Sequence, residues 1–275
     1  MPTARVNGIE MYYEEIGGGE PLILIMGFGG DHLAWAFQAR AFAERYRVVT
    51  FDNRGVGQSD APDTPYSIRT MADDTAALMT ALGIDRAHVV AASMGGMIAQ
   101  ELALAYPVRV RTLHLACTTA RPDAHMKALL ATWRELRTTL SRPSLVRAMA
   151  LWLFSFRTYA ARPEFVEMVI QTALATPYPQ SLAGFLGQAA AIEHHDTLAR
   201  LQRLHCPTLV TVGEDDVLVP PRFSHELAAR IPGATLRTVP EAGHVYFWEQ
   251  PEAFNRLCLD FLAGARREGT ATSRA

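Results

Sequence analysis

Short, mostly apolar segments alternate with longer segments of helical periodicity along most of the chain. Residues 21–26 (PLILIM), 87–92 (AHVVAA) and 207–213 (PTLVTVG) have the length and composition of buried strands. A segment with helical periodicity follows the second of them, at 94–106. Such strand–helix alternation implies a mostly parallel sheet that is covered by helices on both faces. The predicted fold class is therefore α/β.

The alternation stops between residues 118 and 203, where the periodic segments are all helical, and it resumes afterwards. We therefore expect a core made of residues 1–117 and 204–265, interrupted by a helical cap over 118–203. One of the predicted cap helices is continuous over 144–156 (SLVRAMALWLFSF). The final segment, 266–275, is small and polar, and we expect it to be a frayed tail.

Turn residues mark two further elements of the core. Asn7-Gly8 separates two short alternating runs, which predicts a β-hairpin. Apolar residues recur at helical spacing over 69–82, and Gly83 is expected to end that helix.

Charge and cysteine content exclude several classes of protein. The formal net charge of −2 is too close to neutral for a nucleic-acid or anionic-membrane surface. No segment approaches the roughly 20 apolar residues that span a bilayer, and the first residues lack the apolar run of a signal peptide. Cys117, Cys206 and Cys258 form an odd, widely spaced set, which argues against a disulfide framework. We expect a cytoplasmic protein whose oligomeric state is open, with a homodimer among the alternatives.

Ser93 lies at the end of the predicted strand 87–92 and immediately before a helix. This is the setting of a nucleophile elbow, a tight turn that lifts a serine hydroxyl above the sheet and aims a helix N-terminus at it. Gly95 meets the need for a small residue two positions later, and Ala91 stands where the G-x-S-x-G pattern has glycine. The alternative is that Ser93 only caps the helix. If the turn forms, a residue larger than Ala91 should damage folding or activity.

A glycine-rich loop is expected at residues 26–30 (MGFGG), after the strand 21–26. In an elbow enzyme the backbone N–H of Phe28 would be one oxyanion donor, and the N–H of Met94 the other. A glycine cluster after a strand is also a common turn, so the loop alone is weak support.

A carboxylate and a histidine follow the two late strands. Residues 212–220 (VGEDDVLVP) offer Asp216 as the acid that orients a catalytic histidine, with Asp215 and Glu214 as less favoured candidates. His244 lies in the loop EAGHVYF after the last predicted strand, residues 234–239 (ATLRTV). The order Ser93, Asp216, His244 favours a general-base role for the histidine over a structural one.

With these residues the chain resembles the α/β-hydrolase superfamily over nearly its whole length. Residues 51–62 (FDNRGVGQSDAP), 93–107 (SMGGMIAQELALAYP) and 195–216 (HDTLARLQRLHCPTLVTVGEDD) also carry the resemblance. They are similar to serine esterases, enol-lactonases and cofactor-free haloperoxidase-like hydrolases, with the 3-oxoadipate enol-lactonase group nearest in layout. Members often have histidine where this chain has Met26, and the supporting hydrogen bonds of such a histidine are lost here.

The cap is expected to cover the site, because residues 148–156 (AMALWLFSF) are apolar almost all round. Side chains from this segment and from two core loops are candidates to line an apolar pocket, with ordinary packing as the alternative. Besides Met94, the candidates are Phe28, Trp152, Phe154, Phe156 and Phe247. Such a pocket favours small or medium, largely apolar esters or lactones.

Other motifs fail on inspection. Asp60 replaces the last glycine of a dinucleotide fingerprint in GVGQSD. His194, His195 and Asp196 could imitate metal ligands, but adjacent side chains at a helix end point in different directions. Cys117 has no elbow around it and is expected to be inert. We therefore predict neither a metal site nor a cofactor.

Three functions remain open from the sequence. The first is a serine carboxylesterase or lactonase that acts on a small-molecule substrate. The second keeps the triad but cleaves a carbon–carbon bond next to a ketone, or perhydrolyses a carboxylic acid. The third is a ligand-binding receptor or regulator that keeps the hydrolase fold with little or no turnover.

Overall fold

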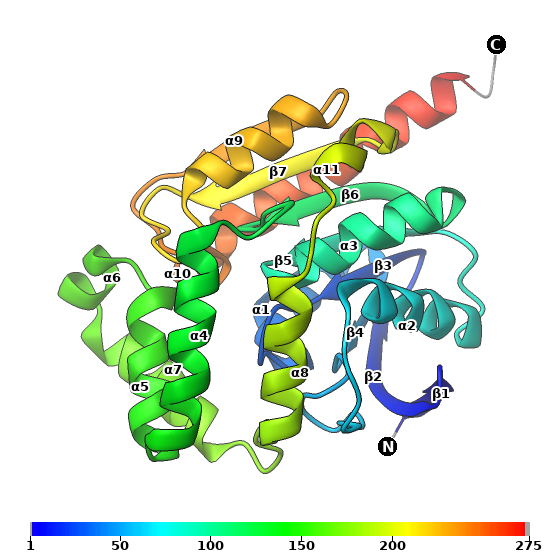
Figure 1. The fold of residues 1–275 in the computed structure, drawn as a ribbon. Coiled ribbons are helices and arrows are strands. Elements are labelled where there is room, and N and C mark those ends of the chain that lie inside the picture. The colour runs from blue at the N-terminus through cyan, green and yellow to red at the C-terminus, as the bar shows by residue number, and fades with distance from the viewer. Residues whose placement is uncertain (1, 273–275) are drawn as a thin grey trace.

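A single eight-stranded sheet runs through the middle of the molecule (Figure 1). The structure is a computed structural model, and it describes residues 2–272. The strand order is β1-β2-β4-β3-β5-β6-β7-β8, and every pairing is parallel except β1 with β2 and β2 with β4. The strands are β1 (Thr3–Val6), β2 (Ile9–Gly17), β3 (Glu20–Ile25), β4 (Tyr46–Phe51), β5 (Ala87–Ala92), β6 (Val110–Ala116), β7 (Thr208–Gly213) and β8 (Thr235–Val239). The predicted α/β class is confirmed.

The predicted hairpin joins β1 to β2, with Val6 paired to Ile9. Asn7 has a φ of 44° and Gly8 a φ of 81°. Positive φ at both central residues is what a two-residue hairpin turn needs to match the twist of its strands.

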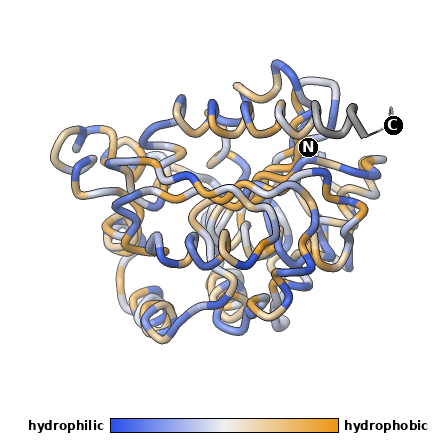
Figure 2. The backbone as a smooth tube through the Cα atoms, turned by 90° about the horizontal axis from the view of Figure 1, so that it is seen from above, coloured by the Kyte–Doolittle hydropathy of each residue, from blue (hydrophilic) through white to orange (hydrophobic). Residues whose placement is uncertain are grey.

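Helices cover both faces of the sheet. One face is packed by α1 (Ala36–Phe42) and α11 (Pro251–Thr272), and the other by α2 (Ile68–Ala81), α3 (Met94–Ala105) and α9 (Pro221–Arg230). Seen from above, the central strands are mostly hydrophobic, whereas the surrounding helices alternate between hydrophobic and hydrophilic turns (Figure 2). This pattern places the core in two layers, one on each face of the sheet. Helix α11 continues to Thr272, so it includes most of the segment 266–275 for which we expected a frayed tail; residues 273–275 lie outside the described residues.

The chain between β6 and β7 forms the helical cap, which lies to one side of the sheet (Figure 1). Its elements are α4 (Ala124–Thr139), α5 (Arg142–Leu153), α6 (Phe156–Ala161), α7 (Pro163–Ala175), α8 (Leu182–Glu193) and the 3₁₀ helix η3 (Leu198–Arg203). Short helices in the core that the sequence did not indicate are η1 (His32–Trp35), η2 (Pro107–Arg109) and α10 (Tyr246–Glu249). Within residues 2–272, no helix is both long and apolar enough to cross a membrane.

The prediction of one continuous helix over 144–156 is wrong. Helix α5 ends at Leu153, and Phe154 is extended with φ −93° and ψ 149°. Ser155 then caps α6 by accepting a hydrogen bond from the N–H of Thr158, while its own N–H donates to Glu249 Oε1 at 2.9 Å. A distant buried carboxylate therefore takes the backbone donor that a continuing helix would have used, and local periodicity could not reveal this.

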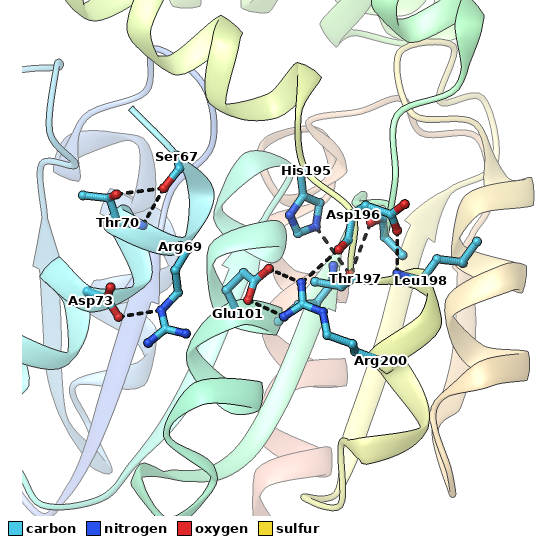
Figure 3. A network of polar contacts seen from close by, with 12 residues as sticks. Ser67, Arg69, Thr70, Asp73, Glu101, His195, Asp196, Thr197, Leu198 and Arg200 are labelled. Atoms are coloured by element: carbon cyan, nitrogen blue, oxygen red, sulfur yellow. Dashed lines mark hydrogen bonds and ion pairs between the residues drawn. The ribbon is translucent and has the colours of Figure 1, made fainter. Parts of the chain in front are cut away.

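Where the chain returns from the cap to the core, polar side chains fix it to α3 (Figure 3). Arg200 makes two hydrogen bonds to the carboxylate of Glu101, at 2.9 and 2.5 Å. Thr197 Oγ1 donates to Gln100 Oε1 at 2.6 Å. His195 lies beside this pair, and burial lowers its pKa to about 4. At this return crossing the bidentate ion pair of Arg200 and Glu101 therefore lies next to His195, whose imidazole is neutral at neutral pH.

Candidate active site

Ser93 occupies a strained turn between β5 and α3. Its backbone has φ 56° and ψ −123°, a conformation that non-glycine residues rarely adopt and that tends to occur at functional sites. The N–H of Ser93 donates to the carbonyl of Ala116 at 2.9 Å, and its carbonyl accepts from Thr118 Oγ1 at 2.7 Å. The side chain makes no capping hydrogen bond, which contradicts the alternative that Ser93 only caps the helix. Every residue from 87 to 103 is buried except Ser93, which is half-buried.

The turn is surrounded by backbone at very short range. A Cβ atom added to Gly95 would lie 2.2 Å from the carbonyl oxygen of Ile25, and one added to Gly27 would lie 2.8 Å from the Cβ of Ser93. The requirement for a small residue at 95 is therefore confirmed. Ala91 is completely buried in β5, in register between Ile25 of β3 and Leu115 of β6.

The loop 26–30 lies directly against this turn. The position of a Cβ on Gly27 is 3.4 Å from the backbone nitrogen of Met94. Asn53 Nδ2 donates to the carbonyl of Met26 at 2.9 Å and so fixes the start of the loop. Among residues 2–272, the amides of Phe28 and Met94 have no hydrogen-bond acceptor. Two amides without acceptors, on the elbow turn and on the loop against it, are groups from which an oxyanion hole can be built.

Asp216 and His244 are in direct contact. Asp216 Oδ2 lies 2.8 Å from His244 Nδ1, and Asp216 Oδ1 accepts from the N–H groups of Leu218 and Val219 at 2.9 and 2.8 Å. Both the acid and the histidine are buried. A carboxylate on Nδ1 holds the proton there and leaves Nε2 as the basic nitrogen.

The neighbouring acids have other partners. Asp215 Oδ2 accepts from Arg157 Nε of α6 at 3.2 Å, and Glu214 Oε2 accepts from the N–H of Glu241 at 3.3 Å. The side chain of Asp215 is only 16% exposed. It ties the cap to the core, and the geometry leaves Asp216 as the partner of the histidine.

Ser93 follows β5, Asp216 follows β7 and His244 follows β8, so all three lie at the carboxyl edge of the sheet. In the part of the chain that the structure describes, no hydrogen bond joins Ser93 to His244. The structure thus pairs the acid with the base and places the strained serine at the same edge. Catalytic hydrogen bonds are often long before substrate binds.

The loop that carries His244 is held by Glu249, a residue that sequence reasoning missed. Glu249 is buried, and its Oε2 accepts from the N–H of Gly243 at 2.6 Å. Its Oε1 accepts from the N–H of Ser155 at 2.9 Å and from Thr158 Oγ1 at 2.5 Å. One carboxylate therefore joins the histidine loop to the start of α6. The signal in the sequence was an acidic residue in the otherwise apolar run VYFWE.

Backbone contacts reinforce this link. A Cβ on Gly243 would lie 2.5 Å from the backbone nitrogen of Ser155 and 2.9 Å from the carbonyl oxygen of Leu153. A Cβ on Gly213, at the end of β7, would lie 2.2 Å from the carbonyl oxygen of Gly243. Strand, histidine loop and cap therefore stack backbone on backbone without side chains between them.

Two of the predicted pocket residues pack in the interior instead. Phe247 is 2% exposed and contacts the rings of Trp35, in η1, and Phe254, in α11. Phe154 is 3% exposed and contacts Phe165 of the cap and Trp248. For both, the alternative of ordinary packing describes the observed surroundings.

The other candidates differ in exposure. Phe156 is 67% exposed, and Trp152 is partly buried against the core. The ring of Phe28 lies between two cap rings that the sequence did not single out, Trp133 at 5.9 Å and Phe185 at 4.8 Å between centroids.

Cys117 and the histidine pair at 194–195 were rejected as functional residues from the sequence. Cys117 is fully buried, and burial, with the charge of Asp216, raises the pKa of its thiol well above the ordinary value. His194 bonds the carbonyl of Ala190 at 2.9 Å. No group of three or more possible ligands that could hold a metal ion occurs among the described residues.

A family model described as the alpha/beta hydrolase fold matches residues 20–251. The chain belongs to the α/β-hydrolase family. Membership of this family, together with the names of its relatives, identifies the protein as a hydrolase. The sheet order with the inserted cap is the fold that the resemblance implied.

Three comparisons show how far the likeness extends. The “Putative carbamate hydrolase RutD” of Caulobacter sp. (strain K31) is 35% identical over 96% of this hydrolase and 99% of that protein. A thermophilic esterase from Thermogutta terrifontis is 30% identical, with a TM-score of 0.86 over 96% of this chain and 99% of that chain. The enol-lactonase from Burkholderia xenovorans LB400 is 28% identical, with a TM-score of 0.87 over 95% of this chain and 100% of that chain.

Proposed function

We propose that this hydrolase cleaves carboxylic esters or lactones through a serine nucleophile. The observation that carries the proposal is the strained turn at Ser93, whose side chain makes no capping bond and which lies directly against the loop 26–30. The pairing of Asp216 with His244 at the same edge of the sheet supplies the base that such a serine needs.

The reaction follows from these groups. His244 Nε2 removes the proton from Ser93 Oγ as the oxygen attacks the carbonyl carbon, and Asp216 stabilises the imidazolium that forms. The amides of Phe28 and Met94 hold the negative oxygen of the tetrahedral intermediate, a contribution of about 2.7–4 kcal/mol for one donor. The imidazolium gives its proton to the leaving alkoxide. Water then attacks the acyl-enzyme with the same histidine as base, which releases the acid and restores Ser93.

The substrate class is proposed from two sources. The aromatic surroundings of Phe28 favour a small or medium, largely apolar acyl group next to the serine. The esterase and enol-lactonase among the similar structures act on bonds of this type by name. The carbamate hydrolase name of the 35% identical relative adds carbamates as a second candidate, since their carbonyl passes through the same kind of tetrahedral intermediate.

Labelling with a fluorophosphonate, followed by peptide mapping, tests the nucleophile directly. The label is expected on Ser93, and Ser93→Ala should remove both labelling and at least about 10⁴-fold of the activity. A label elsewhere, or full activity in Ser93→Ala, would overturn the proposal.

A substrate panel then separates the alternatives. p-Nitrophenyl esters of increasing acyl length, small lactones and an aryl carbamate are expected to give turnover that depends on Ser93. Turnover confined to a vinylogous diketone, or to peroxide-dependent halogenation, would favour carbon–carbon hydrolysis or perhydrolysis. Labelling of Ser93 without turnover of any of these substrates would favour a receptor on the hydrolase fold.

A further inference from the structure

The loop that carries the Phe28 amide is fixed by a side chain from the cap. The N–H of Gly29 donates to Oε1 of Gln188, in α8, at 2.9 Å. Gln188 is completely buried, and its Nε2 donates to the carbonyl of Arg54 at 2.9 Å. Gln180, just before α8, donates from Nε2 to the same Oε1 at 3.0 Å.

These partners allow only one orientation of the Gln188 amide. The N–H of Gly29 can only donate and the carbonyl of Arg54 can only accept, so exchanging the oxygen and nitrogen of Gln188 would oppose like groups at both ends. Gln188 is thus a rigid bridge between two core loops, inserted from the cap.

The platform beneath the bridge is itself rigid. Arg54 makes two hydrogen bonds to the buried carboxylate of Asp74, at 2.5 and 2.7 Å. A Cβ on Gly184 of α8 would lie 2.0 Å from the carbonyl oxygen of Gly55, so helix and loop meet backbone to backbone. Helix α8 cannot shift along this loop without breaking that contact, so Gln188 holds a defined position.

Phe28 is therefore constrained on three sides. Gly27 lies against the Ser93 turn, the N–H of Gly29 is bonded to Gln188, and the ring of Phe28 lies between Trp133 and Phe185. The N–H of Phe28 lies in the peptide plane between Gly27 and Phe28, and the N–H of Gly29 lies in the next plane. The two dihedral angles of Phe28 relate these planes, so fixing both neighbours restricts the direction of the Phe28 N–H. We propose that Gln188 is a positioning residue that aims this amide at the developing oxyanion, a role that rests on the function proposed above.

This role answers a question that the sequence raised. Met26 stands where a histidine with supporting hydrogen bonds is often found, and its side chain offers no N–H or O–H donor. Support for the loop comes instead from Asn53 at its start and from Gln188 at Gly29. The second of these lies in the cap, 159 residues away in sequence.

The test is Gln188→Met, which keeps the length of the side chain but removes the acceptor. With a p-nitrophenyl ester we expect kcat to fall about 10- to 100-fold and KM to change less than about threefold, since a displaced catalytic group loses transition-state binding. The affinity for a trifluoromethyl ketone, which forms the tetrahedral adduct, should fall by the same factor as kcat/KM. Gln188→Glu keeps an acceptor for Gly29 and, as the neutral acid, a donor for the carbonyl of Arg54, so it should recover part of kcat. Gln171→Met, an exposed site in α7, is the matched control and should match the wild type.

Gln180→Met, at a half-buried site, keeps the proposal testable if Gln188→Met does not fold. It removes one bond to Oε1 and should lower trifluoromethyl ketone affinity about 3- to 10-fold. Wild-type kcat and ketone affinity in whichever variant folds, or a change in KM alone, would overturn the positioning role. Failure of the proposed function is distinguishable, because Ser93 would then not label in the wild type either. Labelling of Ser93 at the wild-type rate in Gln188→Met would reject only the role of Gln188.

Discussion

Ser93 and His244 lie at the same edge of the sheet but depend on different parts of the molecule. The Ser93 turn is fixed by Ala116 of β6, by Ile25 of β3 and by Thr118, which lies two residues beyond β6 and ahead of the first cap helix. The His244 loop is bonded through Glu249 to Ser155, and the Phe28 loop is bonded to Gln188, both of the cap. The difference implies that cap substitutions should alter base and oxyanion chemistry while leaving the nucleophile turn intact.

The adjacent acids Asp215 and Asp216 give the sharpest test of this division. Asp216→Asn should lower kcat/KM about 10⁴-fold, because the histidine loses the carboxylate that sets its tautomer. Asp215→Asn removes only a partly exposed ion pair to Arg157, worth about 0–1 kcal/mol, so activity should change less than about threefold. Steady-state measurement of kcat/KM for one ester in both variants tests these expectations. Equal losses in both variants would mean that the cap contact matters as much as the acid.

Gly95→Ala tests the core-held turn. The added methyl would lie 2.2 Å from the carbonyl oxygen of Ile25. We expect a loss of about 3 kcal/mol or more in the free energy of unfolding, measured with urea, and a parallel loss of Ser93 labelling. Gly264→Ala, where nothing lies within 4 Å, is the control, and it should stabilise α11 by up to about 1 kcal/mol. A stable, active Gly95→Ala enzyme would refute the tight turn.

Glu249→Gln tests the cap-held histidine loop. An amide offers one acceptor oxygen, so one of the N–H groups of Gly243 and Ser155 would face an NH₂ group, at a cost of about 1–3 kcal/mol. We expect kcat/KM to fall about 10-fold or more, with faster amide exchange in residues 153–158 and 242–246. Glu252→Gln, at an exposed site, should leave both unchanged. Unchanged exchange in both segments would show that they are not coupled through Glu249.

Ala91→Val should affect the Ser93 turn less than Gly95→Ala does. The residue is completely buried in β5 between Ile25 and Leu115, and the extra carbons should cost about 1–3 kcal/mol of stability. Urea unfolding and the rate of Ser93 labelling measure the two consequences. Wild-type values for both would mean that the sheet has room beside the turn.

The last expected effect, which is absent at neutral pH, is a pH dependence of stability at the return crossing of the cap. Burial lowers the pKa of His195 to about 4 in the folded state, against an ordinary value of about 6.5. Below pH 6.5 the unfolded chain binds a proton that the folded chain does not, so stability should fall as the pH drops from about 6.5 to 4. His195→Gln should flatten this dependence in urea titrations, whereas His194→Gln should not. If the free energy of unfolding changed with pH equally in the two variants, His195 would not be the group responsible.

The sequence predicted the core well because local patterns determine it. The buried runs became strands with nearly the expected bounds, and the Asn7-Gly8 turn formed as its residues require. The setting of Ser93 followed from a strand that ends where a helix begins. These features depend on a few neighbouring residues, and a single chain displays them.

The cap and the pocket were harder to predict because distant residues decide them. The break after Leu153 depends on Glu249, and the burial of Phe247 depends on Trp35 and Phe254. Hydrophobicity alone does not distinguish an aromatic ring that lines a site from one that fills the core. The bond between Gly29 and Gln188 joins positions whose proximity exists only once the cap has packed.

The glycine stack of Gly213, Gly243 and the backbone of Leu153 to Ser155 also bears on redesign of the enzyme. Exchange of the cap is one route to new specificity. A grafted cap that matches this protein only where the chain leaves and re-enters the core would leave the histidine loop without its backbone contacts to residues 153–155. A chimera that folds and works should therefore transfer the segment 153–158 together with Gly243 and Glu249.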